Sequence, residues 1–360
     1  MERLDEIIKR IEKIDYSLEE ETQKRLDNLT KPQGSLGRLE ELAKRIVAIT
    51  RNPTPPVKNK VIFTMAGDHG VTEEGISAYP KEVTPQMVYN FIKGGAGINV
   101  LARHVGARVV IVDMGVACDL EGHPSLVIKK VNYGTKNMAK GPAMSRGEAI
   151  KSIESGMEIF EKEFLGGIDI AGTGDMGIGN TTPSSAITSV ITGKPVEDVT
   201  GRGTGIDDGA LSNKIAIIKK AIGMNKPDAK DAIDILSKVG GFEIGGLTGI
   251  ILAAAARKVP VVIDGFISGA AALIAYTLVP EVKYYMIAAH CSVERGHRAA
   301  LDHIGLRPLL DLNLRLGEGT GAALGMSIVE ASVKILTEMA TFKSAAVSQK
   351  DDAQREQVKL

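Results

Sequence analysis

Short apolar runs alternate with helical periodicity from residue 57 to residue 305. The runs are apolar on both faces, as buried parallel strands are, and they cover residues 60–66, 107–112, 167–171, 259–263 and 282–288. Apolar residues recur at helical spacing in residues 84–101, 146–160, 183–191, 213–222 and 246–258. The alternation predicts an α/β fold with a doubly wound, mostly parallel, Rossmann-like sheet.

Both ends of the chain show helical patterns without strands. Leucines and isoleucines recur at helical spacing in residues 4–11 and 36–49, and residues 325–339 form a third such stretch. A proline-rich segment at 52–56 ends the first helical region. We therefore expect a smaller helical domain built from both chain ends. The expected parts are a small domain at 1–56 and 306–343, a large domain at 57–305 and a polar tail at 344–360.

Each predicted strand is followed by a polar loop, usually with glycine. The loops cover residues 67–71, 113–116, 172–182, 264–269 and 290–296. In an open parallel sheet, ligands bind in the crevice outside the carboxyl ends of the strands. The five loops therefore predict one ligand site along that edge of the sheet.

The loop at 172–182 is the most informative of the five, with the sequence GTGDMGIGNTT. It stands between a predicted strand and a predicted helix, so its glycines and the free N–H groups of the first helical turn form an anion site. Asp175 places a carboxylate among these donors. The pattern predicts a phosphorylated small molecule with chemistry beside it.

Two further glycine turns carry charged residues. The turn GRGTG at 201–205 precedes a helix with Lys214, and backbone donors plus a lysine suit a phosphate. Glu318 lies between two glycines. The leucines around it favour desolvation of the carboxylate, which raises its pKa toward a value useful for a base. Arg315, three residues earlier, is a candidate contact for a phosphate or carboxylate.

Composition excludes several classes of protein. The 360 residues are 44% apolar and 24% charged, and 44 basic residues balance 44 acidic ones, so the excess of positive charge of a nucleic-acid binder is missing. Only 4% are aromatic and none is Trp, which disfavours base stacking. A charged N-terminus, two cysteines and the lack of a long apolar run predict a cytoplasmic enzyme with no membrane span.

Other kinds of chemistry have weaker signals. The histidines are scattered without the ligand spacing of zinc motifs, and no Gly-x-Ser-x-Gly elbow is present, so we expect no metal and no serine hydrolase. Gly172, Gly174 and Gly177 match the dinucleotide fingerprint, which keeps an NAD-dependent oxidoreductase open. A non-catalytic nucleotide-binding module is also open.

The ordered motifs resemble the nicotinate-nucleotide–dimethylbenzimidazole phosphoribosyltransferase family over residues 20 to 342. The motifs that carry the resemblance are TKPQGSLGRLE at 30–40, AGDHGV at 66–71, YPKEVT at 79–84, GDMGIGNTT at 174–182, GRGTG at 201–205, AHCS at 289–292 and RLGEGTG at 315–321. The resemblance implies transfer of phosphoribose from nicotinate mononucleotide to a benzimidazole base, with no cofactor, in the assembly of the nucleotide loop of cobalamin. The products are nicotinate and α-ribazole 5′-phosphate. Because family members are homodimers, the resemblance also implies a homodimer.

The resemblance also implies roles for individual residues. Glu318 matches the family's base, and Asp175 is a second catalytic candidate beside the reacting sugar. The implied phosphate and ribose contacts are Gly177, Gly179, Asn180, Gly203, Thr204, Gly205, Lys214, Ser292 and Arg315. The implied wall of the base pocket is Tyr79, Pro80, Gln86, Met87 and Leu316.

One residue departs from the family's pattern. Many members have glutamate in the glycine turn where this chain has Asp175. The shorter side chain withdraws the carboxylate by one methylene, and displacements of about 1 Å matter at a reacting centre. Some relatives glycosylate phenols or other benzimidazoles, so the resemblance does not decide which aromatic base this protein uses as acceptor.

Overall fold

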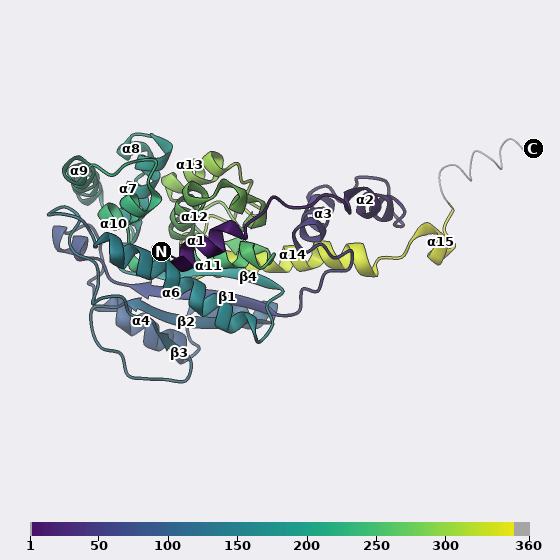
Figure 1. Ribbon diagram of the computed structural model, residues 1–360, viewed down its shortest axis with the longest axis horizontal. Helices are drawn as coiled ribbons and strands as arrows, with labels where there is room; N and C mark the ends of the chain where they lie inside the picture. Colours follow the sequence, from purple (N-terminus) through teal and green to yellow (C-terminus); the bar gives the residue numbers. More distant parts are fainter. Residues whose placement is uncertain (1, 349–360) are drawn as a thin grey trace, which may run out of the picture. The chain divides into compact units, whose positions relative to one another are not determined.

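Six parallel strands form one sheet in the order β3-β2-β1-β4-β5-β6, which confirms the doubly wound parallel sheet that the sequence predicts. The computed structural model describes residues 2–348. The strands are β1 (Lys60–Gly67), β2 (Ala107–Gly115), β3 (Leu126–Ile128), β4 (Ile170–Met176), β5 (Val261–Ile263) and β6 (Met286–Ala288). The order reverses between β1 and β4, which pair in register with Met65 opposite Asp175. Figure 1 shows β1, β2 and β4 side by side.

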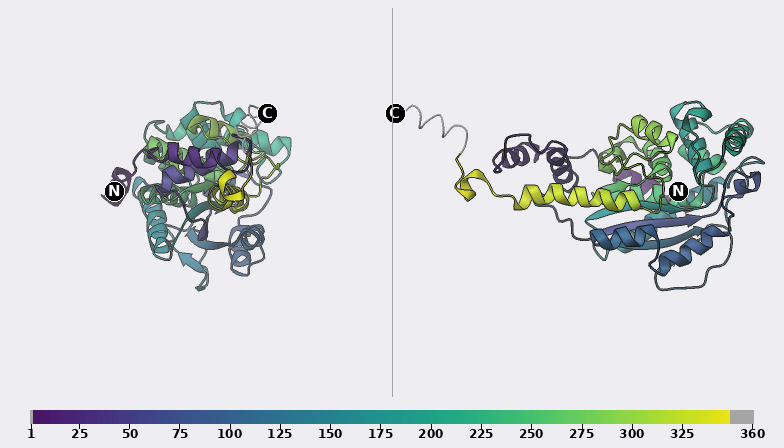
Figure 2. Two further views of the ribbon diagram at one scale, coloured as in Figure 1. Left: turned by 90° about the vertical axis from the view of Figure 1, so that its right-hand side faces the viewer. Right: turned by 180° about the vertical axis from the view of Figure 1, so that it is seen from behind.

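Helices cover both faces of the sheet. On one face α11 (Phe242–Ala256) packs against β1, β2 and β4, and α6 (Arg146–Phe164) lies beside it. These two helices approach closely because glycines face each other: a Cβ on Gly156 would lie 2.0 Å from the carbonyl oxygen of Gly246. On the other face are α4 (Val83–Ile92) and α5 (Gly97–Val105), which contact β1 and β2 (Figure 2, right).

The remaining elements complete two compact units. The first contains Met1–Lys13 and Lys58–Met326, and the second contains Ile14–Val57 and the chain from Ser327 onward. The first unit also holds α1 (Glu2–Lys9), η1 (Gly70–Glu74), α7 (Thr181–Thr192), α8 (Val196–Val199), α9 (Asp208–Asn225), α10 (Ala232–Val239), α12 (Phe266–Leu278), η2 (Pro280–Tyr285) and α13 (Arg295–Ile304). Helix α14 (Thr320–Glu338) begins in the first unit and ends in the second.

The second unit is helical and has its own small core. It contains α2 (Glu19–Asp27), α3 (Arg38–Thr50), the end of α14 and α15 (Phe342–Ala345). Leu26, Leu29, Ala43, Val47 and Leu336 are buried together there. The motif at 30–40 lies in this unit, where Lys31 and Glu40 form a buried ion pair at 2.8 Å. Residues 349–360 of the expected tail lie outside the described residues.

The unit boundaries differ from the sequence-based division. Residues 1–13 belong to the sheet-containing unit, because Leu4, Ile7 and Ile11 are buried and α1 packs on α6 and α11. Residues 306–326, including the Glu318 turn, also belong to that unit rather than to the helical one.

Several predicted elements need correction. The sequence predicted a strand that ends at residue 171, but β4 continues through Met176, so Gly172 and Gly174 are strand residues. The single helix predicted over 84–101 is two helices, α4 and α5, which Gly94 and Gly95 separate. Residues 280–285 form a 3-10 helix before a β6 of only three residues. Strand β3 was not predicted at all.

Candidate active site

A cavity of about 510 Å³ opens at the carboxyl ends of β4, β5 and β6, within the larger unit. Its walls come from the loops that follow these strands, together with the turns at 203–204 and 313–317. The predicted site residues in its wall are Tyr79, Asp175, Gly177, Gly179, Asn180, Gly203, Thr204, Ser292, Arg315 and Leu316. The structure therefore brings residues from five distant segments to the edge that parallel-sheet topology indicates.

The glycines of the 172–182 segment divide into two groups with different roles. Gly174 lies in β4, and a Cβ there would be 2.3 Å from the carbonyl oxygen of Glu318, so its role is close packing of the Glu318 turn. Gly177 and Gly179 form the turn itself, and Gly179 has a φ of +85°. Helix α7 begins directly after, at Thr181, and Asn180 and Thr181 line the cavity.

Asp175 is buried at the end of β4, in the cavity wall. Its Oδ2 accepts a hydrogen bond from the Asn180 side chain at 2.9 Å, and its Oδ1 has no hydrogen-bond partner within residues 2–348. Burial raises the pKa of the Asp175 carboxyl well above its ordinary value, and the nearby Asp264 carboxylate adds to the rise. The carboxyl therefore holds its proton more strongly than an exposed aspartate does.

Glu318 stands in a strained turn beside the cavity. Its φ is +63°, and Gly317 and Gly319 on either side also have positive φ. Its main-chain N–H donates to the Asp175 carbonyl at 3.2 Å, and its own carbonyl accepts from Thr64 Oγ1 at 2.9 Å. The turn is thereby attached to β4 near its end and to the middle of β1.

The Glu318 side chain is directed toward the first turn of α5. Its Oε2 accepts a hydrogen bond from the Ile98 N–H at 3.0 Å. Burial raises the pKa of the Glu318 carboxyl, although this amide bond opposes the rise. A Cβ on Gly97 would be 2.9 Å from Leu316 Cδ2 and 3.2 Å from Glu318 Oε2, so a side chain at this position would displace one or both of these side-chain ends. Glu318 itself does not line the 510 Å³ cavity, whereas its neighbours Leu316 and Gly317 do.

Lys214 supports the cavity wall from behind. It is buried on α9 and does not line the cavity, and its Nζ donates to Thr181 Oγ1 at 2.6 Å. Burial lowers the pKa of Lys214 to about 8, against the attraction of the Glu294 carboxylate. A Cβ on Gly203 would be 3.2 Å from this Nζ, so the lysine lies between the start of α7 and the 201–205 turn.

The 201–205 turn is held by two charged side chains. The Gly203 N–H donates to Glu294 Oε1 at 2.8 Å, and Arg315 donates to the Gly203 carbonyl at 2.9 Å. Thr204 accepts a hydrogen bond from the Ala78 N–H at 3.1 Å, which attaches the turn to the loop before Tyr79. Gly205 lines an adjoining pocket of about 330 Å³ instead of the main cavity.

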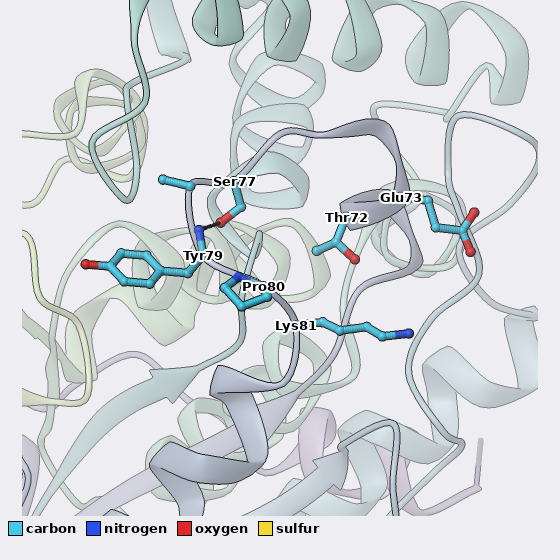
Figure 3. A pocket seen from close by; sticks show the side chains of 7 residues that line it. Thr72, Glu73, Ser77, Tyr79, Pro80 and Lys81 are labelled. Carbon is cyan, nitrogen blue, oxygen red and sulfur yellow. Dashed lines mark hydrogen bonds between the residues drawn. The ribbon is translucent and has the colours of Figure 1, made fainter.

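The residues expected in the base pocket are not all together. Tyr79 and Leu316 line the main cavity and are 56% and 59% exposed. Pro80 lines a second, more open pocket, which shares Ser77 and Tyr79 with the main cavity. Figure 3 shows this pocket, where the Tyr79 ring points away from Glu73 and Lys81. Gln86 and Met87, on α4, line neither of these two pockets.

Sequence reasoning missed several buried polar residues around the site. Asp264 follows β5, His290 follows β6, and Glu294 precedes α13; each stands in a strand-end loop, which is the signal that could have found it. A fourth group is the buried pair of His69 and Glu243, 2.8 Å apart, beneath the Gly177 turn. Burial alone would lower the pKa of His69, but the Glu243 carboxylate outweighs it and the pKa is raised.

Within the described part of the chain, no group of three or more His, Cys, Asp or Glu residues is arranged to hold a metal ion. None of the helices in residues 2–348 has the length and apolarity needed to cross a membrane.

The sequence matches proteins of one family along almost its entire length. The family model described as phosphoribosyltransferase matches residues 11–347. The nicotinate-nucleotide–dimethylbenzimidazole phosphoribosyltransferase of Geobacter sulfurreducens is 58% identical over 351 residues, 98% of this chain and 100% of that protein. The protein of that name from Desulforudis audaxviator is 58% identical over 97% of this chain and 99% of its own length.

A solved structure agrees with these sequence matches. The crystal structure of the nicotinate-nucleotide–dimethylbenzimidazole phosphoribosyltransferase from Thermus thermophilus superposes with a TM-score of 0.88 at 41% identity. The match covers 93% of this chain and 100% of that one. The chain belongs to the nicotinate-nucleotide–dimethylbenzimidazole phosphoribosyltransferase family.

Proposed function

We propose that this protein transfers phosphoribose from nicotinate mononucleotide to 5,6-dimethylbenzimidazole or a related base, in nucleotide-loop assembly of cobalamin. The names of relatives that are 56–59% identical over nearly the full chain support this reaction rather than an NAD-dependent oxidation or passive nucleotide binding. The observation that carries the proposal is the Glu318 carboxylate, fixed in a left-handed turn next to a cavity that the start of α7 lines.

The donor phosphate is assigned to the polar side of the cavity. The start of α7 lines this side, and the Gly179 and Thr181 N–H groups there are the backbone donors proposed for the anion, with Asn180 between them. Lys214 and Arg315 stand around the same corner, on either side of the Gly203 turn, and charge-assisted bonds from these two cations to phosphate are strong. Ser292, Gly177, Thr204 and Gly205 complete the proposed set of phosphate and ribose contacts.

The ribose then extends toward Asp175 and Gly317. A Cβ on Gly317 would lie only 3.1 Å from Asp175 Oδ2, so the carboxyl faces the catalytic turn directly. Positive charge develops at the anomeric carbon as the bond to the pyridinium nitrogen breaks. Such a charge lowers the pKa of an adjacent carboxyl, so Asp175 becomes a better electrostatic partner as the reaction proceeds.

The acceptor base is assigned to the space near Leu316, Tyr79 and Gly97. One ring nitrogen of the benzimidazole forms the new bond to the anomeric carbon while nicotinate leaves as a neutral pyridine with its carboxylate. Glu318 removes the proton from the other ring nitrogen, for which its raised pKa suits it. Attack opposite the leaving group gives the α-configured product. Pro80, Gln86 and Met87 remain proposed members of the base-pocket wall, although they do not line the main cavity at the ends of β4, β5 and β6.

The reaction is tested by mass analysis of products from nicotinate mononucleotide with a panel of benzimidazoles, purines and phenols. We expect α-ribazole 5′-phosphate or a close analogue, and nicotinate release only when an acceptor is present. Nicotinate release without any acceptor adduct, or no release at all, would contradict the proposal. We also propose a cytoplasmic homodimer, as in family members, which light scattering of the purified protein would test for assembly.

A further inference from the structure

Asp264, the first residue after β5, binds the start of α14 with both carboxylate oxygens. Its Oδ2 accepts from the Gly319 N–H at 3.1 Å, and its Oδ1 accepts from the Ala322 N–H at 2.9 Å. The Gly321 amide also donates to this carboxylate. Asp264 is fully buried, so these bonds form in a region of low dielectric where they are strong.

The three amides lie within four residues after Glu318 in the chain. A residue such as Glu318 with a left-handed backbone costs about 1–2 kcal/mol, and it keeps that conformation only when its surroundings fix it. The Asp175 carbonyl accepts the Glu318 N–H, and Thr64 Oγ1 donates to the Glu318 carbonyl. Within the turn, the N–H and the hydroxyl of Thr320 donate to the Gly317 carbonyl. Asp264 adds the contacts that hold the amides following Glu318.

His290 stands between Asp264 and the cavity. It is 2% exposed, lines the cavity, and its Nε2 is 4.0 Å from Asp264 Oδ1. Its ring also fills the space beside the turn, because a Cβ on Gly321 would lie 2.1 Å from His290 Cδ2. Its Nδ1 has no hydrogen-bond partner within the described chain, and a buried polar atom of this kind normally has one.

We propose that Asp264 is a positioning residue for Glu318, and that His290 couples Asp264 to the donor nucleotide. The proposal rests on the phosphoribosyl transfer proposed above. Bound donor supplies His290 Nδ1 with an oxygen partner, either a ribose hydroxyl or the nicotinate carboxylate. The imidazole is then fixed against Asp264 and Gly321, so occupancy of the donor site stiffens the turn that carries the base.

The first test compares Asp264→Asn with Asp231→Asn. Asp231 also binds helix-start amides: its Oδ1 accepts from the Ile233 and Asp234 amides of α10 at 3.0 Å, and it lies outside the cavity wall. The side chain of the D264N variant must turn an NH₂ group toward one of the α14 amides. We expect kcat to fall about 100-fold with the donor KM changed less than about threefold, and kcat of the Asp231 variant to stay within about twofold of the parent.

A second readout does not depend on turnover. Hydrogen exchange of the amides in 319–322 is expected to accelerate at least about tenfold in Asp264→Asn and to be unchanged in Asp231→Asn. Unchanged exchange at these amides, or kcat within about threefold of an active parent, would overturn the role of Asp264. A parent protein that transfers no phosphoribose would instead contradict the proposed reaction, and the exchange result would still stand by itself.

The coupling through His290 is tested with His290→Phe, which leaves Asp264 intact. Calorimetry is expected to show donor binding weakened about tenfold, the effect of one lost hydrogen bond. If ribose 5-phosphate binding weakens equally, the partner is a ribose hydroxyl; if only nicotinate mononucleotide binding weakens, the partner is the nicotinate carboxylate. Donor protection of the 319–322 amides should be lost in this variant.

A double-mutant cycle tests whether Asp264 and His290 act together. Because the two residues act on one turn, the loss of kcat/KM in Asp264→Asn/His290→Phe should be at least about fivefold smaller than the product of the single losses. Unchanged donor binding in His290→Phe, or losses that multiply, would show that His290 does not couple the two sites.

Discussion

The main-chain N–H of Glu318 donates to the main-chain carbonyl of Asp175, 3.2 Å away. This single bond joins the two candidate catalytic carboxyl groups through the backbone, so neither side chain is used to hold the other. Both carboxyl groups are buried and both have raised pKa values, because burial disfavours the charged form. The pair therefore offers two proton-binding groups with different neighbours beside one cavity.

Glu318→Gln tests the base most directly. The amide keeps the size of the side chain and its acceptor oxygen for the Ile98 N–H, but it cannot take a proton. We expect kcat to fall at least about 100-fold while donor affinity changes less than about threefold. Steady-state kinetics and calorimetry measure the two quantities, with the exposed Glu121→Gln as a matched control. Parent-like turnover of the E318Q enzyme would exclude Glu318 as the base.

The stability of Asp175→Asn should depend on pH in a defined direction. In the folded protein the raised pKa keeps Asp175 protonated at pH values where the unfolded chain, with a pKa of about 3.9, has released its proton. The folded state then binds more protons, so Asp175 lowers the free energy of unfolding as pH rises above about 3.9. The side-chain amide of the D175N variant mimics the protonated acid without this slope.

We therefore expect Asp175→Asn to raise the unfolding temperature by a few degrees near neutral pH and to lose this advantage at acidic pH. Thermal unfolding of both proteins across the pH range measures the difference. A variant less stable than the parent at neutral pH would show that the Asp175 carboxyl is ionised and favourably held in the folded protein.

Gly174→Ala tests the contact between β4 and the catalytic turn. A methyl group at this position would lie 2.3 Å from the Glu318 carbonyl oxygen and 2.7 Å from the Gly319 nitrogen, so the turn must move. We expect kcat to fall at least about tenfold and the protein to lose about 1–3 kcal/mol of stability. The control is Gly122→Ala, where a methyl group meets nothing within 4 Å. Equal kinetics in both variants would mean that the turn tolerates displacement.

The fold was largely predictable because its signals are local. The runs at 60–66 and 107–112 are apolar on both faces and correspond to β1 and β2, the longest strands of the sheet. Strand β3 has three residues, too few for periodicity to distinguish from a loop. The extension of β4 through Gly172 and Gly174 contradicts the turn preference of glycine, because close packing of Ala322, Met326 and the Glu318 turn requires the absence of side chains there.

The site was less predictable because its partners are distant in sequence. Glycines around Glu318 mark a special turn, and that signal is visible in the chain. Asp264 is different: a single aspartate after a short strand gives no sign that it accepts the amides of a helix that begins at Thr320. Likewise, the sequence associated Lys214 with phosphate, but only the structure shows that it is buried against Thr181.

Donor affinity should depend on the protonation of Lys214. The pKa of this lysine is about 8 in the folded protein without ligand, so it loses its charge as pH rises through that value. Phosphate favours the charged form, so donor binding should weaken about tenfold between pH 7 and pH 9. Lys214→Met should bind the donor at least about tenfold more weakly at pH 7 and lose this pH dependence.

The matched control for Lys214 is Lys220→Met, because Lys220 is exposed on the same helix. Calorimetric titration with nicotinate mononucleotide at several pH values measures both variants. The control should keep the parent's affinity and its decline above a pH of about 8. A parent affinity that is constant across this pH range would place the Lys214 ammonium outside the phosphate contacts.

Thr204 should govern the acceptor side of the cavity through the loop that carries Tyr79. Its Oγ1 accepts the Ala78 N–H at 3.1 Å and lies 3.4 Å from Ser77 Oγ, so the hydroxyl joins two walls of the cavity. Thr204→Val keeps the shape but leaves the Ala78 amide without its partner, and Tyr79, already 56% exposed, loses its support. We expect the KM for the benzimidazole to rise about tenfold with kcat nearly unchanged, and Thr204→Ser to restore the parent value because it keeps the oxygen. A valine variant whose KM for the benzimidazole stays at the parent value would show that the hydrogen bond from Ala78 to Thr204 does not shape the acceptor side of the cavity.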